Sequence, residues 1–121
     1  MVLILGGMGA GKKTYAKTLG FSDAQMNADV HSDAPVLLDL DKTVRNDPDG
    51  AAALLPLLRK KTFVLCCEVG SGVVPLDAKD RAYREAVGRL CCALAEEADA
   101  VVRVVAGIPM LLKGEWPCRY D

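Results

Sequence analysis

The N-terminal segment constrains the fold more than any other part of the chain. Residues 2–5 form a short apolar run that ends at Gly6-Gly7, and residues 12–19 can wind as a helix that Gly20 closes. Between them stands the pattern Gly, four residues, Gly-Lys, which is the phosphate-binding loop (P-loop) pattern between a strand and a helix. Because the pattern lies in its required structural context, it predicts a site for a nucleoside triphosphate.

This loop contains the predicted nucleotide-binding residues. Its glycines let successive backbone amides point into one concavity, and the helix N-terminus adds partial positive charge. Lys12 can reach the outer phosphates. A tight strand-to-helix turn without a ligand is the alternative, but it does not explain a lysine directly after the last glycine. The predicted binding residues are Gly6, Gly7, Met8, Gly9, Ala10, Gly11, Lys12, Lys13 and Thr14.

Lys13 departs from the pattern, because the residue after Lys12 normally supplies a serine or threonine hydroxyl to Mg²⁺. Thr14 lies one place late. A helix advances about 100° per residue, so Thr14 can bind the metal only if the turn is remodelled. Lys13 itself can either repel the metal or add a phosphate contact. The motif therefore predicts nucleotide binding and leaves turnover open.

The rest of the chain alternates between apolar runs and helical patterns. This alternation predicts an α/β fold, a P-loop NTPase-like and mostly parallel sheet with helices on both faces. The polar stretch 21–33 is the best candidate for a mobile loop. The expected strands are residues 36–40, 63–67, 101–105 and a short one at 108–112, and the expected helices are 51–60 and 77–98.

Length and charge limit the possible functions. With 121 residues, the chain matches the usual size of one domain, about 100 to 150 residues, so we expect a single domain over 1–121. Its 15 basic and 16 acidic residues nearly cancel, which argues against a nucleic-acid or anionic-membrane partner. No apolar run approaches the roughly 20 residues of a membrane span, and the start lacks a secretory signal, so a cytoplasmic location is expected.

The five cysteines are interpreted as small hydrophobic residues of a reduced protein. Cys66-Cys67 and Cys91-Cys92 are adjacent pairs. Zinc sites use pairs with a two-residue gap, and an odd total argues against a disulfide framework.

Acidic side chains are expected at the strand ends, where ligands of such sheets bind. Asp39 and Asp41 end the strand at 36–40, on the same side if the strand continues that far, and Glu68 follows the next strand. Asp39 and Thr14 are the predicted Mg²⁺ ligands, with loop solubility or helix capping as the alternative for the acid. His31 lies in the polar stretch and is interpreted as a surface residue.

Several segments together resemble one enzyme family, the bifunctional adenosylcobinamide kinase and adenosylcobinamide-phosphate guanylyltransferase of cobalamin biosynthesis. The C-terminal half identifies the family, because its residues match in order and spacing. The N-terminal segments at 3–12 and 37–39 are also similar, so the resemblance covers most of the chain. The C-terminal segments are Glu-Val-Gly-Ser-Gly-Val-Val-Pro at 68–75, Arg81, Tyr83-Arg84, Gly88-Arg89, and 98–99 leading to 104–108.

The resemblance implies a reaction. Members of the family phosphorylate the aminopropanol hydroxyl of adenosylcobinamide with ATP or GTP, and then transfer GMP through a guanylylated histidine. By this analogy the catalytic residues are Lys12, which counters charge as the γ-phosphoryl group leaves, and Asp39 or Glu68, which organises Mg²⁺ or the attacking hydroxyl. The analogy also implies a homo-oligomer.

The chain departs from the family in two places. The family's histidine stands in an Arg-Ile, two-residue, His segment followed by Arg-Pro, and the corresponding stretch is much shorter here. His31 lacks the flanking arginines, so the guanylyl-transfer role is not assigned to it, and Cys67 stands where asparagine is usual. Two other functions stay open: a non-catalytic nucleotide-binding or regulatory relative, and a P-loop kinase for another small alcohol.

Overall fold

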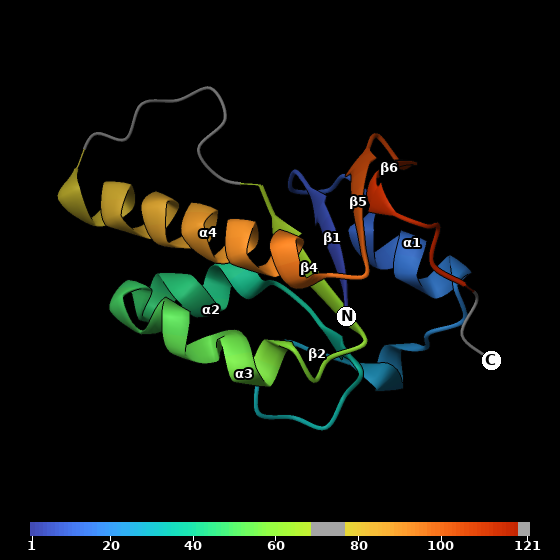
Figure 1. Cartoon of the computed structure of the whole chain (residues 1–121), viewed down its shortest axis with the longest axis horizontal. Helices are drawn as coiled ribbons and strands as arrows, with labels where there is room; N and C mark the ends of the chain where they lie inside the picture. Colours follow the sequence, from blue (N-terminus) through green and yellow to red (C-terminus); the bar gives the residue numbers. More distant parts are fainter. Residues whose placement is uncertain (69–76, 119–121) are drawn as a thin grey trace.

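A six-stranded sheet organises the described part of the chain, residues 1–68 and 77–118 of the computed structural model (Figure 1). The strand order is β2-β3-β4-β1-β5-β6. The strands are β1 (Val2–Gly6), β2 (Met26–Asn27), β3 (Val36–Leu37), β4 (Phe63–Cys67), β5 (Ala100–Val105) and β6 (Ile108–Gly114). The helices are α1 (Lys12–Thr18), α2 (Leu40–Asn46), α3 (Leu55–Leu58) and α4 (Ala78–Glu97), with 3₁₀ turns η1 (Asp23–Gln25) and η2 (Pro48–Leu54).

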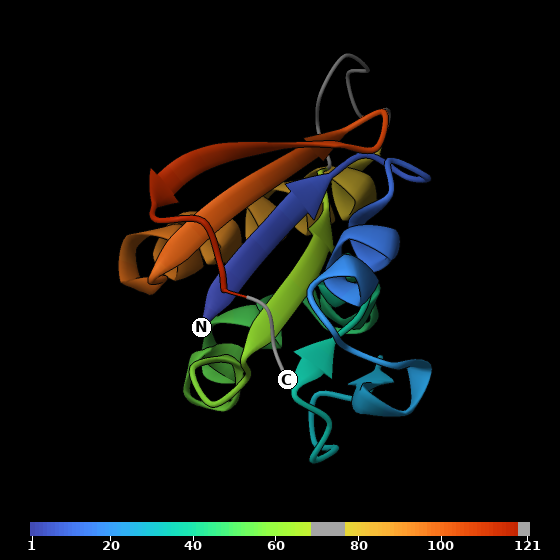
Figure 2. The ribbon, with the colours of Figure 1, turned by 90° about the vertical axis from the view of Figure 1, so that its right-hand side faces the viewer.

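The sheet is mostly parallel, as the sequence predicts. β1 lies between β4 and β5 and pairs in parallel with both, and β3 and β2 extend the parallel part. β6 alone is antiparallel and forms a hairpin with β5, which Figure 2 shows beside the central strands. The predicted α/β class is therefore confirmed, with an antiparallel edge.

Helices cover both faces of this sheet. Along β4, Val64 and Cys66 pack into the cluster beneath α2, α3 and α4, while Phe63 and Leu65 pack into the cluster on the α1 side. Successive side chains of a strand point to opposite faces, so a strand with no polar residue at 63–66 is buried on both. Figure 1 shows the two helical layers separated by the sheet.

Helix α4 follows its sequence pattern closely. Its N-cap Asp77 accepts a hydrogen bond of 2.6 Å from the backbone N–H of Asp80. Its buried residues recur at intervals of three and four and face the core; they are Tyr83, Val87, Leu90 and Leu94. No described helix is both long enough and apolar enough to span a bilayer.

The expected strand at 36–40 is too long. Only Val36–Leu37 joins the sheet, and Leu40 already begins α2. Asp39 adopts a left-handed backbone conformation with φ of 52°, which turns the chain sharply and places Leu40 in the core, fully buried.

Two other segments also differ from expectation. The stretch 21–33 contains η1 and β2, and β2 adds an edge strand to the sheet. At the start of η1 the backbone N–H of Ser22 donates to the Gln25 Oε1 at 2.8 Å. The helix expected at 51–60 is a 3₁₀ turn that continues into α3. Pro56 explains the change, because a proline inside an α-helix clashes with the preceding turn, whereas the first turn tolerates it.

Candidate functional site

The glycine-rich turn leaves the carboxyl end of β1 and leads into α1. Gly9 and Gly11 have φ of 72° and 102°, in the left-handed region that glycine adopts without strain. The backbone N–H of Ala10 donates to the Gly7 carbonyl at 3.1 Å, and the Gly107 N–H donates to the Ala10 carbonyl at 2.8 Å. The turn of the β5–β6 hairpin is therefore hydrogen-bonded to the glycine turn and supports it.

Gly11 is the N-cap of α1 and offers no side-chain cap. The first backbone N–H groups of a helix have no partner within the helix. A bound anion or water can therefore accept their hydrogen bonds.

Lys12 folds back over the same turn. Its Nζ donates to the carbonyl oxygens of Gly6 and Gly7, at 3.1 and 2.8 Å, and lies 3.7 Å from the Cys67 Sγ at the end of β4. These contacts place the positive charge between the turn and the neighbouring strand. An anion bound by the turn would lie within reach of it.

A cleft of about 390 Å³ opens at this edge of the sheet. It brings the second half of the glycine turn together with Asp39, which is distant in sequence. The residues that line it are Gly9, Gly11, Lys12, Lys13, Thr14, Leu38, Asp39 and Leu65.

Asp39 and Asp41 do not share one side of a strand, because β3 ends at Leu37 and the condition for that expectation is not met. Asp39 is the N-cap of α2, its side chain is 46% exposed, and its carboxylate lies 3.6 Å from the Lys42 Nζ. Asp41 is buried within α2, and its Oδ1 accepts a hydrogen bond of 3.0 Å from the backbone N–H of Cys67. Only Asp39 reaches the cleft; Asp41 holds the end of β4.

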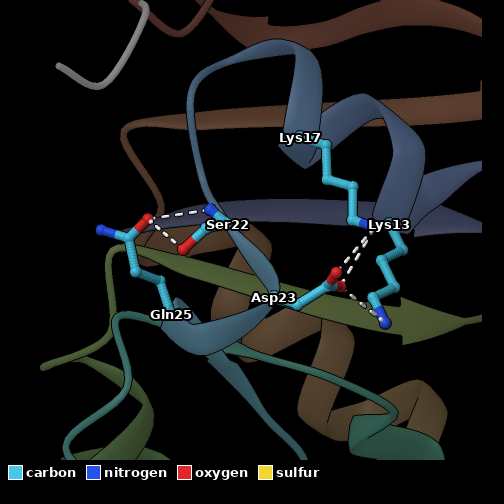
Figure 3. Close-up of polar contacts among 5 residues, drawn as sticks. All are labelled: Lys13, Lys17, Ser22, Asp23 and Gln25. Carbon is cyan, nitrogen blue, oxygen red and sulfur yellow. Dashed lines mark hydrogen bonds and ion pairs between the residues drawn. The ribbon is translucent and has the colours of Figure 1, made fainter.

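Lys13 and Thr14 are both exposed at the start of α1. Figure 3 shows the side chains of Lys13 and Lys17 both reaching Asp23. The Lys13 Nζ lies 3.3 Å from Asp23 Oδ1, and the Lys17 Nζ lies 3.0 Å from the same oxygen. Two hydrogen bonds lower the pKa of the Asp23 carboxyl, and the one from Lys17 has a larger effect than the one from Lys13. The lysine in the unusual motif position is therefore ion-paired with the turn that follows α1, a contact that the sequence does not reveal.

Glu68 borders the glycine turn without lining the cleft. Its backbone N–H donates to the Gly6 carbonyl at 2.9 Å. Its carboxylate accepts two hydrogen bonds from Arg103 on β5, at 2.8 and 3.1 Å. Arg103 was not among the predicted site residues, although a charged residue inside the apolar run of β5 was a usable signal.

His31 lies away from this cleft. It is exposed, and its backbone N–H donates to Asp29 Oδ1 at 2.9 Å. Another hollow, of about 350 Å³, lies between η2 and α4 and contains none of the predicted site residues. The predicted residues that the fold brings together are therefore the glycine turn, Lys12 and Asp39, with Glu68 beside them.

The chain matches the family model described as cobinamide kinase / cobinamide phosphate guanyltransferase over residues 24–112. It is also similar to the bifunctional adenosylcobalamin biosynthesis protein CobP of Pseudomonas aeruginosa, with 41% identity over 81 residues. That alignment covers 65% of this chain and 47% of the relative, so the chain spans about half the length of the curated relative it matches. The family match begins after the glycine turn, whose interpretation rests on its own motif and geometry.

Proposed function

The chain belongs to the cobinamide kinase / cobinamide phosphate guanyltransferase family, and on this premise we propose that it is a kinase-like P-loop transferase of cobalamin biosynthesis. Its proposed reaction is the phosphorylation of adenosylcobinamide with ATP or GTP. The observation that carries the proposal is the cleft at the carboxyl end of β1, which joins the glycine turn and Lys12 to Asp39.

The proposed roles follow from these positions. The turn amides and the start of α1 bind the phosphates, and Lys12 exchanges its carbonyl partners in the turn for phosphate oxygens. Such a cation stabilises negative charge as the γ-phosphoryl group is transferred. Glu68, which shares its carboxylate with Arg103, is proposed to orient the attacking hydroxyl from beside the turn.

The cleft also contains oxygen donors suited to Mg²⁺. Mg²⁺ in nucleotide sites is typically held by one or two carboxylates, water and substrate phosphates. The half-exposed Asp39 carboxylate and the exposed Thr14 hydroxyl line the same cleft, so Asp39, with Thr14 as a second candidate, is the proposed ligand set. When bound there, the metal would neutralise phosphate charge.

A second candidate function is a nucleotide-binding or regulatory protein without catalysis. The observation that favours it is Lys13, which occupies the motif position of the metal-binding hydroxyl and is ion-paired with Asp23. A kinase for another small alcohol would use the same cleft and differ only in its acceptor.

Calorimetry with ATP and GTP, with and without Mg²⁺, followed by a phosphorylation assay on adenosylcobinamide, separates these functions. Binding with transfer supports the proposed kinase. Binding without transfer to any of a panel of small alcohols supports the non-catalytic function, and transfer to a different alcohol identifies the third. A chain that binds neither nucleotide would contradict all three.

We expect Lys13→Ser to strengthen Mg²⁺-dependent triphosphate binding or turnover by about 3- to 10-fold, because it supplies the missing hydroxyl and removes a nearby positive charge. Titrations with and without Mg²⁺ measure the change. The matched control is Lys17→Ser, because Lys17 also pairs with Asp23 but does not line the cleft. If Lys13→Ser weakens binding and Lys17→Ser does not, Lys13 is instead a phosphate ligand.

We also expect no stable guanylyl-enzyme after incubation with GTP and Mg²⁺. A histidine nucleophile must be held in line with the α-phosphate while basic groups stabilise the developing charge. His31 lies outside the phosphate cleft, and the nearby Asp29 and Asp33 repel a triphosphate. GTP labelled at the α-phosphate, followed by a denaturing gel, tests this. An acid-labile label that is lost in His31→Ala would overturn the prediction.

A further inference from the structure

Two cysteines that are distant in sequence meet behind the candidate site. Cys66 lies on β4 and Cys91 on α4, and their sulfur atoms are 3.6 Å apart. Cys66 belongs to the core cluster of the α4 face, and Cys91 packs against that cluster. Both are free thiols, and the contact joins the central sheet to its longest covering helix.

The two thiols differ in access and in acidity. Cys66 is fully buried, whereas Cys91 is partly exposed. The hydrogen bond with Cys91, together with burial, raises the pKa of the Cys66 thiol. The hydrogen bond with Cys66 lowers the pKa of Cys91, although burial opposes this effect. Cys91 is therefore the more readily ionised and the more accessible member of the pair, which suits it to react first.

We propose that Cys66 and Cys91 form a redox-active dithiol that hydrogen peroxide oxidises to a disulfide, tethering the carboxyl end of β4 to α4. The Cys91 thiolate attacks one peroxide oxygen, the O–O bond breaks, and hydroxide leaves to give a sulfenic acid. The Cys66 sulfur then attacks the sulfenic sulfur and the S–O bond breaks. The Cys66 proton and the departing hydroxyl group form water. Two thiols and one peroxide thus yield one disulfide and two waters.

The pair adjoins the candidate nucleotide site through the next residue of β4. Cys66 Sγ donates to the Cys67 carbonyl at 3.5 Å, and the Cys67 N–H donates to Asp41 at 3.0 Å. The Cys67 Sγ in turn lies beside the Lys12 ammonium. The disulfide would fix the strand end that carries Cys67 and leads to Glu68.

Peptide mapping under non-reducing conditions tests the proposal on the full chain. The reduced protein is treated with hydrogen peroxide at a small molar excess, alkylated and digested. We expect a linked peptide containing Cys66 and Cys91, lighter by two hydrogens than the two reduced peptides together, which dithiothreitol separates. Cys92→Ser should keep this link, whereas Cys91→Ser, one residue away on α4, should abolish it. A link through another cysteine instead, or no link, would overturn the proposal.

Thermal unfolding tests the tether. A cross-link between residues 66 and 91 restricts the unfolded chain, so oxidation should raise the melting temperature of the wild type and of Cys92→Ser by about 5 °C or more. Cys91→Ser should show no such rise. If Cys91→Ser fails to fold, the mapped link and the rise in melting temperature of the wild type still test the proposal. A lower melting temperature in the linked protein would contradict the tether.

Discussion

Lys12→Ala is expected to weaken triphosphate binding by about 10- to 100-fold and to leave the protein folded. A hydrogen bond to a charged group contributes about 1.5–3 kcal/mol, and each 1.4 kcal/mol corresponds to a tenfold change in affinity. The Lys12 ammonium lies at the mouth of the glycine turn, so phosphate oxygens are its expected partners when nucleotide binds. Calorimetry with ATP and GTP measures the loss.

The fold should tolerate this substitution because neither carbonyl partner of Lys12 is left without a donor. The buried Gly6 carbonyl keeps its hydrogen bond from the Glu68 N–H. The contact of Lys12 with the Gly7 carbonyl is exposed to solvent, so water can replace the lysine there. The melting temperature should therefore change little. Lys17→Ala is the matched control, since Lys17 lies on the same helix but pairs with Asp23 outside the cleft. Unchanged affinity in Lys12→Ala would remove the P-loop hypothesis, and an equal loss in Lys17→Ala would assign the effect to overall charge.

Local sequence signals predicted the main elements well. The glycine turn, the apolar run of β4 and the periodicity of α4 are each determined by residues within one segment, and the structure has all three. The strand at 36–40 was overestimated because Leu38 and Leu40 continue the apolar run. What ends the strand is the backbone turn at Asp39, which composition does not reveal.

The surroundings of the site were harder to predict than its residues. The pairing of Glu68 with Arg103 joins residues 35 positions apart, and Cys67 meets Lys12 across 55 positions. Such contacts depend on which strands are neighbours in the sheet, and β1 lies between β4 and β5 although the chain reaches them in another order. Strand order is a property of the whole fold, so a scan of local patterns leaves these partners open.

Lys61 was among the residues that the sequence did not distinguish. It is 7% exposed, and its Nζ donates to the carbonyl oxygens of Ser32 and Ala34, at 2.6 and 2.9 Å. Next to it, the backbone N–H groups of Thr62 and Phe63 donate to the Pro35 carbonyl. The segment that leads into β3 is thus fastened to the start of β4 by one buried side chain and two backbone bonds.

We expect Lys61→Met to lower the free energy of unfolding by about 2–3 kcal/mol, which corresponds to a fall in melting temperature of roughly 8–12 °C. Methionine is a flexible, unbranched side chain that can fill much of the same space, so the loss reflects the carbonyls of Ser32 and Ala34, which lose their charged donor in a partly buried place. Urea denaturation measures it. Lys60→Met, the same change at the exposed neighbouring lysine, should stay within about 0.5 kcal/mol of the wild type. Equal stability of both variants would show that the segment before β3 does not depend on Lys61.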